Sequence, residues 1–175
     1  MFKTYLIVDG YNVIHHWAEG EKIEQIRLEE AREDLIHALN SYSGYMDYET
    51  ILVFDAYSQE DQELREERRG RIRVVFTEKN KTADSYIEKL VYSLPKPYTV
   101  KVVTSDYTLQ RMVLAGGGER ISSREFLEDI QYSKKRMARH AKTRGEITDS
   151  NKLEDYMSDT VLRKMKKMRK GSMED

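Results

Sequence analysis

Four aspartates follow short runs of apolar, β-branched residues, at positions where strands are expected to end. Asp9 ends the first run, Asp55 follows the second, and Asp106 completes the motif Thr104-Ser105-Asp106 after a later one. Asp84 lies in the first turn of an expected helix a few residues after another run. These carboxylates are far apart in sequence, so only a folded arrangement of the strands can bring them together.

Each aspartate alone has an ordinary structural role available to it, as an Asx-turn, a helix N-cap or a partner for a helix dipole. Four together need more, because like charges within ~4–6 Å raise one another's pKa and destabilise the fold. A divalent cation would relieve that repulsion. Oxygen ligands without cysteine or histidine favour Mg²⁺ or Mn²⁺ over zinc. Carboxylate-held metals of this kind act mostly on phosphate groups.

The residues next to these aspartates suit phosphate or nucleic-acid chemistry, although each has a structural alternative. Asn12 can reach the same edge as Asp9 and serve a phosphate, or act as a turn residue. The hydroxyls of Thr104 and Ser105 can orient a carboxylate or cap a helix. Tyr11 and Tyr107 each lie beside an expected site residue and can stack on bases.

Several other kinds of site are excluded by composition or spacing. The 175 residues include no cysteine, which excludes disulfides, thiolate zinc sites, iron–sulfur clusters and a cysteine nucleophile. No P-loop is present, and the glycine run at 116–118 lacks the dinucleotide-binding spacing. The sequence Asp9-Gly10-Tyr11 has tyrosine where phosphatases of the haloacid dehalogenase type carry a second aspartate.

The elements that must position these residues alternate along the chain. Strands are expected at Thr4–Val8, Thr50–Phe54, Ile72–Phe76 and Thr99–Thr104, with a fifth around Arg120-Ile121. Helical spacing of apolar residues falls between them, and Thr82 and the capping box Ser122–Glu125 indicate helix starts. This alternation predicts an α/β fold with a parallel sheet, helices on both faces and a site at the carboxyl ends of the strands. The segment Gln59–Gly70 is too charged for a core and is expected to be a solvated loop or an exposed helix.

Charge is distributed unevenly over a chain whose formal net charge is only −1. From Gln131 to Asp175 there are 13 Lys and Arg against 7 Asp and Glu, whereas residues 1–130 have 17 against 24. A basic surface of this kind attracts phosphate, although a run of charges is also how a solvated helix face looks. We expect one folded domain over 1–145, a linker from Gly145 to Ser150, and a basic C-terminal helix within 146–175. In that helix, Leu153, Met157, Val161, Met165 and Met168 form one apolar stripe.

The longest apolar stretches are about five residues, far short of a membrane span or a signal peptide. Together with the absence of cysteine, this favours a cytoplasmic protein that is not bound to a membrane. Oligomeric state has no signal in the sequence.

Four motifs in this order resemble a YacP-type NYN domain, a branch of the PIN-like nucleases. They are Val8-Asp9-Gly10-Tyr11-Asn12, Phe54-Asp55-Ala56, Lys81-Thr82-Ala83-Asp84 and Thr104-Ser105-Asp106, and the match extends through Arg120–Leu127. The resemblance covers roughly residues 3 to 140. It implies a three-layer PIN-like Rossmannoid with a parallel sheet of four to five strands, followed here by the basic helical extension. It further implies a Mg²⁺- or Mn²⁺-dependent endoribonuclease, and its bacterial branch suggests cleavage of mRNA on the ribosome.

The same resemblance assigns roles to residues of this chain. The catalytic set is Asp9, Asp84, Asp106 and Asn12, and the metal ligands are Asp9, Asp55, Asp84 and Asp106. Candidates for RNA contact are Tyr11, Lys81, Ser105, Tyr107, Arg124, Lys134, Lys135, Arg136 and Arg139. Many PIN domains add a glutamate from an early helix, for which Glu29, Glu30 and Glu33 stay open. Two alternative functions stay open as well: a non-catalytic module that binds RNA or the ribosome, and a 5′-nuclease or phosphatase using the same acids.

Overall fold

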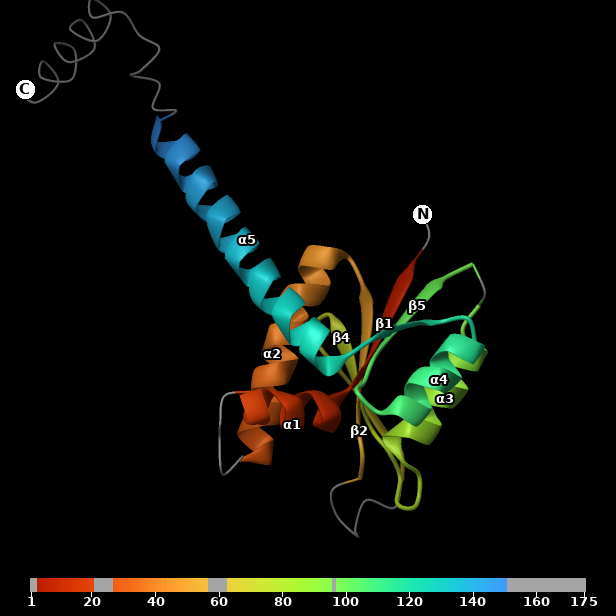
Figure 1. Ribbon diagram of the computed structural model, residues 1–175. Helices are drawn as coiled ribbons and strands as arrows, with labels where there is room; N and C mark the ends of the chain where they lie inside the picture. Colours follow the sequence, from red (N-terminus) through yellow and green to blue (C-terminus); the bar gives the residue numbers. More distant parts are fainter. Residues whose placement is uncertain (1–2, 21–26, 57–62, 96, 151–175) are drawn as a thin grey trace, which may run out of the picture. The chain divides into compact units, whose positions relative to one another are not determined.

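A computed structural model of the chain describes residues 3–20, 27–56, 63–95 and 97–150, with side chains up to residue 142 (Figure 1). The chain divides into two units, with the boundary between Lys134 and Lys135. The first unit contains every strand of the sheet described below.

Six strands form one sheet in the order β3-β4-β2-β1-β5-β6. Their bounds are β1 Thr4–Asp9, β2 Glu49–Phe54, β3 Arg65–Arg69, β4 Ile72–Phe76, β5 Thr99–Val103 and β6 Glu119–Ile121. All neighbours pair in parallel except β3 and β4, which form an antiparallel hairpin at one edge. The central strands β1 and β2 are nearly continuous apolar runs because both of their faces are covered.

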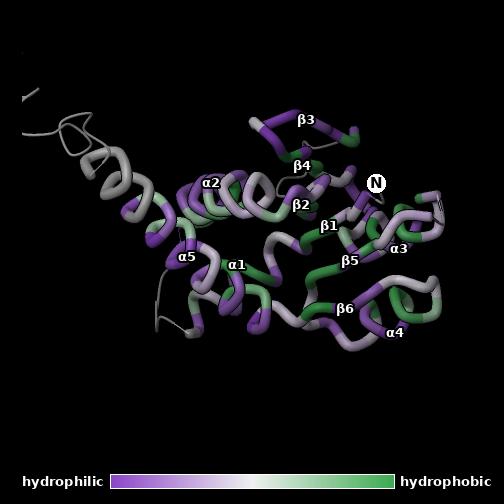
Figure 2. The backbone as a smooth tube through the Cα atoms, turned by 90° about the horizontal axis from the view of Figure 1, so that it is seen from above, coloured by the Kyte–Doolittle hydropathy of each residue, from purple (hydrophilic) through white to green (hydrophobic). Residues whose placement is uncertain are grey.

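Helices cover both faces of this sheet, which gives the three layers expected from the sequence (Figure 2). The helices are α1 Gly10–Gly20, α2 Leu28–Met46, α3 Ala83–Ser93, α4 Tyr107–Ala115 and α5 Ser123–Ser150. Alternate residues of β1 point to opposite sides: Leu6 and Val8 pack with α1, α2 and the beginning of α5, whereas Ile7 packs with α3 and α4. The alternation fixes which side chains of each strand end face which helices.

The expected strands are all present, and helices α3 and α5 begin where Thr82 and the capping box Ser122–Glu125 indicated. Two elements differ from expectation. Residues Arg65–Arg69, within the segment expected to be a loop or a helix, form the edge strand β3, which raises the number of strands to six. Helix α1 was not expected, and it begins at Gly10 directly after the first strand.

The C-terminal expectations have mixed outcomes. Residues Gly145–Ser150, expected to be a linker, continue helix α5 without a break. The apolar stripe from Leu153 to Met168 lies outside the described residues. Among the described residues, no helix combines the length and the apolar character needed to cross a membrane.

The order of the strands creates one reversal of direction next to β1. The chain proceeds from β1 outward to β2 and β4, and then returns past β1 to β5 on its other side. In open α/β sheets, ligands bind at the carboxyl ends of the strands where such a reversal occurs. Asp9 ends β1 and Thr104 follows β5, so both residues lie at this point.

Candidate active site

Asp9 is a nearly buried carboxylate at the point where β1 passes into α1, with 7% of its surface exposed. One oxygen accepts a hydrogen bond from the backbone N–H of Asn12 at 3.4 Å, and the other accepts one from the Thr104 hydroxyl at 3.2 Å. Burial, together with repulsion by Asp84 and more weakly by Asp55, raises the pKa of Asp9 to about 6. The two hydrogen bonds oppose that rise without cancelling it.

Asp84 is brought to the same site by the start of α3. Thr82 caps this helix by accepting a hydrogen bond from the Ser85 N–H at 3.2 Å, as the sequence predicted. Burial raises the pKa of Asp84, and repulsion by Asp106 and Asp55 raises it further. Electrostatic repulsion therefore links the four aspartates that the sequence singled out.

Asp55 and Asp106 also hold helix ends in place. Asp55 Oδ1 accepts a hydrogen bond from the Ala83 N–H at 2.6 Å, which ties the end of β2 to the start of α3. Asp106 is the N-cap of α4 and accepts from the Leu109 N–H at 2.8 Å. A carboxylate has two oxygens with about four acceptor positions, so a capping bond at one oxygen is compatible with a ligand at the other.

Asn12 joins three segments of the chain around Asp9. Its side-chain oxygen accepts hydrogen bonds from the Ser105 N–H at 2.8 Å and from the Ser123 hydroxyl at 2.6 Å. The Ser123 N–H in turn donates to the Ser105 hydroxyl oxygen at 3.1 Å. The side-chain carbonyl of Asn12 is therefore committed to joining α1, the loop after β5 and the start of α5.

Sequence reasoning missed Ser123, which is fully buried in this network. Its only signal was its place inside the capping box, which the structure confirms: the Ser122 N–H donates to Glu125 at 2.8 Å, and the Glu125 N–H donates to the Ser122 hydroxyl at 3.2 Å. The capping box explains where α5 starts. It does not reveal that the next serine bonds to Asn12.

The two tyrosines expected to stack on bases have different surroundings. The Tyr11 ring packs on Phe54, with the ring centroids 4.9 Å apart, and is half-buried. Tyr107 is 71% exposed beside Asp106, and the Arg111 guanidinium lies 5.9 Å from its ring centroid. Tyr107 is therefore the more accessible platform for a base.

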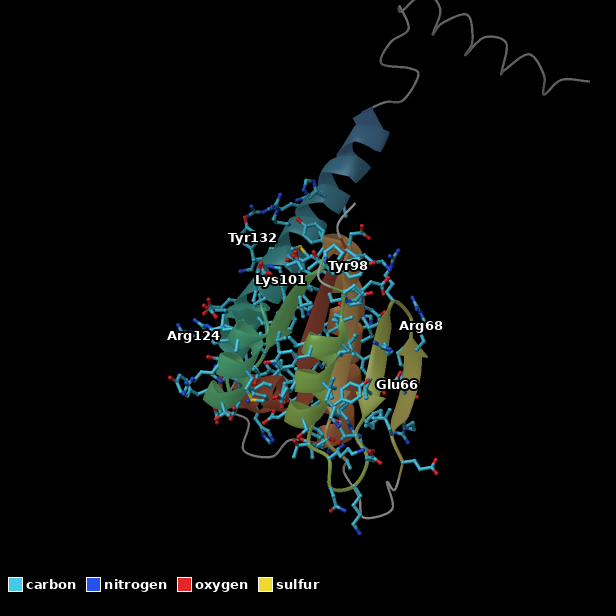
Figure 3. All side chains as sticks on the ribbon, turned by 90° about the vertical axis from the view of Figure 1, so that its right-hand side faces the viewer. Glu66, Arg68, Tyr98, Lys101, Arg124 and Tyr132 are labelled. Atoms are coloured by element: carbon cyan, nitrogen blue, oxygen red, sulfur yellow. The ribbon has the colours of Figure 1, made fainter. Side chains whose placement is uncertain are left out.

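The other residues expected to contact RNA lie on the surface or near the site. Lys81 forms an ion pair with Glu78. Arg124, labelled in Figure 3, is exposed and forms an ion pair with Glu128 at 3.1 Å. Lys134, Lys135, Arg136 and Arg139 lie along α5, and all four are exposed.

The three candidate glutamates all lie near the start of α2. Glu30 pairs with Arg27 at 3.0 Å, and Glu33 pairs with Arg69 at 2.6 Å. Glu29 lies in the first turn of the helix. Glu30 and Glu33 therefore form ion pairs with arginines that are not part of the aspartate site.

A divalent cation would find only part of its ligand shell in the protein. Within the described residues, no three His, Cys, Asp or Glu side chains are grouped so as to hold an ion by themselves. Mg²⁺ is usually bound through one or two carboxylates, with water and substrate phosphates completing its shell. The mutually repelling pair Asp9 and Asp84 fits that mode, because a cation would remove the repulsion that raises both pKa values.

Comparison with known proteins gives one consistent result. Residues 6–170 match the YacP-like NYN domain family. The chain is 34% identical over 170 residues to the "Uncharacterized protein YacP" of Bacillus subtilis (strain 168), covering 97% of this chain and 98% of that protein.

Two crystal structures of Rae1 (YacP) from Bacillus subtilis are similar to the chain in three dimensions. One aligns with a TM-score of 0.69 at 32% identity, covering 97% of this chain and 96% of the other. The second, of a tryptophan-to-leucine mutant, aligns with a TM-score of 0.67 at 35% identity, covering 79% and 81% of the two chains.

Proposed function

The chain belongs to the YacP-like NYN domain family, whose function is of a nuclease type related to RNA, and from this premise we propose that it is a Mg²⁺- or Mn²⁺-dependent endoribonuclease. We further propose that its substrate is mRNA and that it acts in association with the ribosome. The observation that carries the proposal is the coupling of four aspartates at the carboxyl ends of the strands, with Asp9 nearly buried among them.

Each residue of the site has a distinct part in this proposal. Asp9 and Asp84 hold the cation, and Asp55 and Asp106 add negative charge while fixing the starts of α3 and α4. The Thr104 hydroxyl orients Asp9 by donating to its Oδ2. When bound, the cation supplies electrophilic stabilisation of the charge that develops on the phosphodiester during cleavage.

RNA contact in this proposal comes from exposed side chains. Tyr107, next to Asp106, offers an exposed ring on which a base stacks. The basic residues of α5 attract phosphates. Asn12 acts through its neighbours, because it positions the backbone of Ser105 next to Asp106.

The test uses purified protein with naked circular RNA, naked linear RNA and translating ribosomes, each with Mg²⁺, with Mn²⁺ or with a chelator. Circular RNA has no ends, so its cleavage requires an endonuclease and excludes a 5′-nuclease. We expect metal-dependent cuts that Asp84→Asn abolishes and that the exposed control Asp34→Asn leaves unchanged. Cleavage only with ribosomes would support the ribosome-dependent form. Full cleavage by Asp84→Asn, or cleavage that persists in the chelator, would contradict the metal site.

A further inference from the structure

Phe76, the last residue of β4, is flanked by guanidinium groups from two other elements. Arg65 of β3 pairs directly opposite Phe76 in the sheet, and its guanidinium carbon lies 4.3 Å from the ring centroid. Arg32 of α2 places its guanidinium carbon 5.9 Å from the same centroid. Cations over an aromatic face are attracted by the ring quadrupole, which holds the N–H donors in a defined place.

Among the described residues, Arg65 has no carboxylate partner of the kind that Arg69 and Arg73 of the β3–β4 hairpin have. Arg69 pairs with Glu33 and Glu67, and Arg73 pairs with Glu66 at 3.5 Å. Arg68 donates to the Gly70 carbonyl at 3.3 Å. Among the described residues, no carboxylate lies within ion-pair distance of the exposed Arg65. Charged residues protect edge strands from pairing with other chains, but that role requires neither an aromatic platform nor a second arginine beside it.

This pair of arginines lies on the same edge of the sheet as the aspartates. The rings of Tyr11, Phe54 and Phe76 form a continuous row, with centroids 4.9 Å and 5.5 Å apart, which begins two residues after Asp9. From Phe76 the chain continues through the loop at 77–82 to Asp84. Three strand spacings of about 4.8 Å separate β1 from β3, so Arg65 lies roughly 14 Å along the edge from Asp9.

A second aromatic–arginine pair lies on the other side of the aspartates. Tyr107 and Arg111 follow β5, on the side of β1 away from β4 and β3. The carboxyl edge of the sheet therefore carries an arginine–aromatic group, then the aspartates, and then another such group. This order suits a single strand of nucleic acid that runs along the edge and has its scissile phosphate in the middle.

We propose that Arg65 and Arg32, held around Phe76, form a phosphate-binding subsite for single-stranded RNA away from the scissile bond. The inference deepens the proposed function and rests on RNA being the substrate. Guanidinium groups bind phosphate oxygens in a bidentate manner, which makes arginine better suited than lysine. At about 3.4 Å per stacked nucleotide, the roughly 14 Å offset corresponds to about four nucleotides, so only longer RNAs reach the subsite.

The test measures binding of fluorescent single-stranded RNAs of about 3 and about 12 nucleotides over a salt series. Each variant is combined with Asp84→Asn and assayed with Mg²⁺, so that the probe is not cleaved. The variants are Arg65→Ala, Arg65→Lys and Phe76→Leu, and the matched control is Arg68→Ala from the same strand (Figure 3). Thermal melts identify any variant that fails to fold.

We expect Arg65→Ala to weaken binding of the longer RNA by about 5- to 10-fold and to make the log–log salt slope shallower by about 0.7, the value for one phosphate contact on a single strand. Arg65→Lys and Phe76→Leu lose part of that affinity, and Arg68→Ala loses none. Binding of the short RNA does not change between variants. Equal affinities of Arg65→Ala and Arg68→Ala for the longer RNA would overturn the subsite.

The outcomes also separate this inference from the proposed function. If Asp84→Asn alone binds no RNA at any salt concentration, RNA is not the ligand, and both the proposed function and the subsite are wrong. If Arg65→Ala weakens RNA binding but the wild-type protein cuts no RNA with any metal, the subsite stands and the nuclease proposal falls.

Discussion

Opposing contributions set the free energy of ionising the Asp9 carboxyl group. Burial and the charges of Asp84 and Asp55 disfavour its ionised form, whereas hydrogen bonds from Asn12 and Thr104 favour it. The pKa is about 6 in the folded chain against 3.8 for an ordinary aspartate. Between these values the folded state binds more protons than the unfolded state, so without metal this group makes the fold more stable as the pH falls. At about 1.4 kcal/mol per pKa unit, the difference between pH 7.5 and acid pH is of the order of 3 kcal/mol.

We therefore predict that Asp9→Asn abolishes cleavage and, in a chelator, stabilises the fold at pH 7.5 by about 1–2 kcal/mol. This gain is smaller than the roughly 3 kcal/mol by which ionised Asp9 destabilises the fold. The reason is that the asparagine amide accepts only one of the two hydrogen bonds, each of which contributes about 1 kcal/mol. The stability gain of Asp9→Asn over the wild type disappears by about pH 4.5, because the Asp9 carboxyl of the folded wild type is protonated there. Denaturant unfolding at both pH values measures it, with Asp34→Asn as the control. A stability gain that is equal at both pH values would show that repulsion at Asp9 is not its source.

Gly10 has a steric reason to be glycine. A Cβ atom added there would lie 2.3 Å from the Phe54 ring, which is fully buried and cannot move aside freely. We predict that Gly10→Ala destabilises the fold by about 1–3 kcal/mol, as overpacking of a core does, and lowers cleavage by displacing Asp9. The matched control is Gly20→Ala at the other end of α1, where nothing lies within 4 Å of the added atom. Melting temperatures compare the two, and equal values would contradict this account.

At the scale of elements, the apolar strands were predictable because both of their faces are buried and their composition shows it. The edge strand β3 was not, because its residues Arg65–Arg69 are all charged and it owes its conformation to pairing with β4. Such charges are typical of an exposed edge. Helix α1 did have a signal in the spacing of Val13, Ile14, Trp17 and Ala18, but it starts at Gly10 with no polar cap to mark it.

The candidate site was partly predictable for the same physical reason. The aspartates stand at strand ends, and the parallel topology brings strand ends to one edge, so their grouping follows from the order of elements. The network of Asn12, Ser105 and Ser123 does not follow, because it depends on where the start of α5 meets the loop after β5. No spacing in a sequence reports a contact between residues 111 positions apart.

That network yields a prediction about how α5 is attached. Ser123→Ala removes the 2.6 Å hydrogen bond to the Asn12 oxygen inside a fully buried site. We expect a loss of about 1–2 kcal/mol in stability, typical of a buried hydrogen bond, and reduced cleavage because the loop carrying Ser105 and Asp106 is less well held. The control is Ser41→Ala, whose exposed hydroxyl donates to the His37 carbonyl of its own helix. If both variants unfold at the same denaturant concentration, the network does not stabilise the site.

At the scale of the whole molecule, charge is divided between two regions of opposite sign. Residues 1–130 have 24 acidic side chains against 17 basic ones, whereas residues 131–175 have 13 basic against 7 acidic. In the function we propose, an acidic site repels RNA until a cation is present, and a separate basic region gives the RNA a first point of attraction. On that proposal the basic region governs affinity and its dependence on salt, and the aspartates govern cleavage.

This division leads to a prediction about the basic residues Lys134, Lys135, Arg136 and Arg139 of α5. Reversing all four to Glu is expected to weaken binding of RNA or ribosomes and to make the log–log salt slope shallower by up to about 3, since each phosphate neutralised on a single strand accounts for about 0.7. The melting temperature stays within about 2 °C, because exposed charges on a helix contribute little to stability. Binding is measured across a salt series alongside a thermal melt.

A control for net charge completes that experiment. The double reversal of Lys134 and Lys135 is compared with a double reversal of Arg71 and Lys89, which lie on the β3–β4 turn and on α3. Both double variants change the net charge by the same amount, so a general loss of attraction weakens RNA binding by both equally.

Because Lys134, Lys135, Arg136 and Arg139 lie within six positions of one helix, they cover more than one face, and some of them contribute only to solvation. A larger loss of affinity for the α5 pair therefore supports direct phosphate contact by this segment. Equal affinity of the two pairs at low salt, where electrostatic binding is strongest, would identify the α5 run as an ordinary solvated helix face.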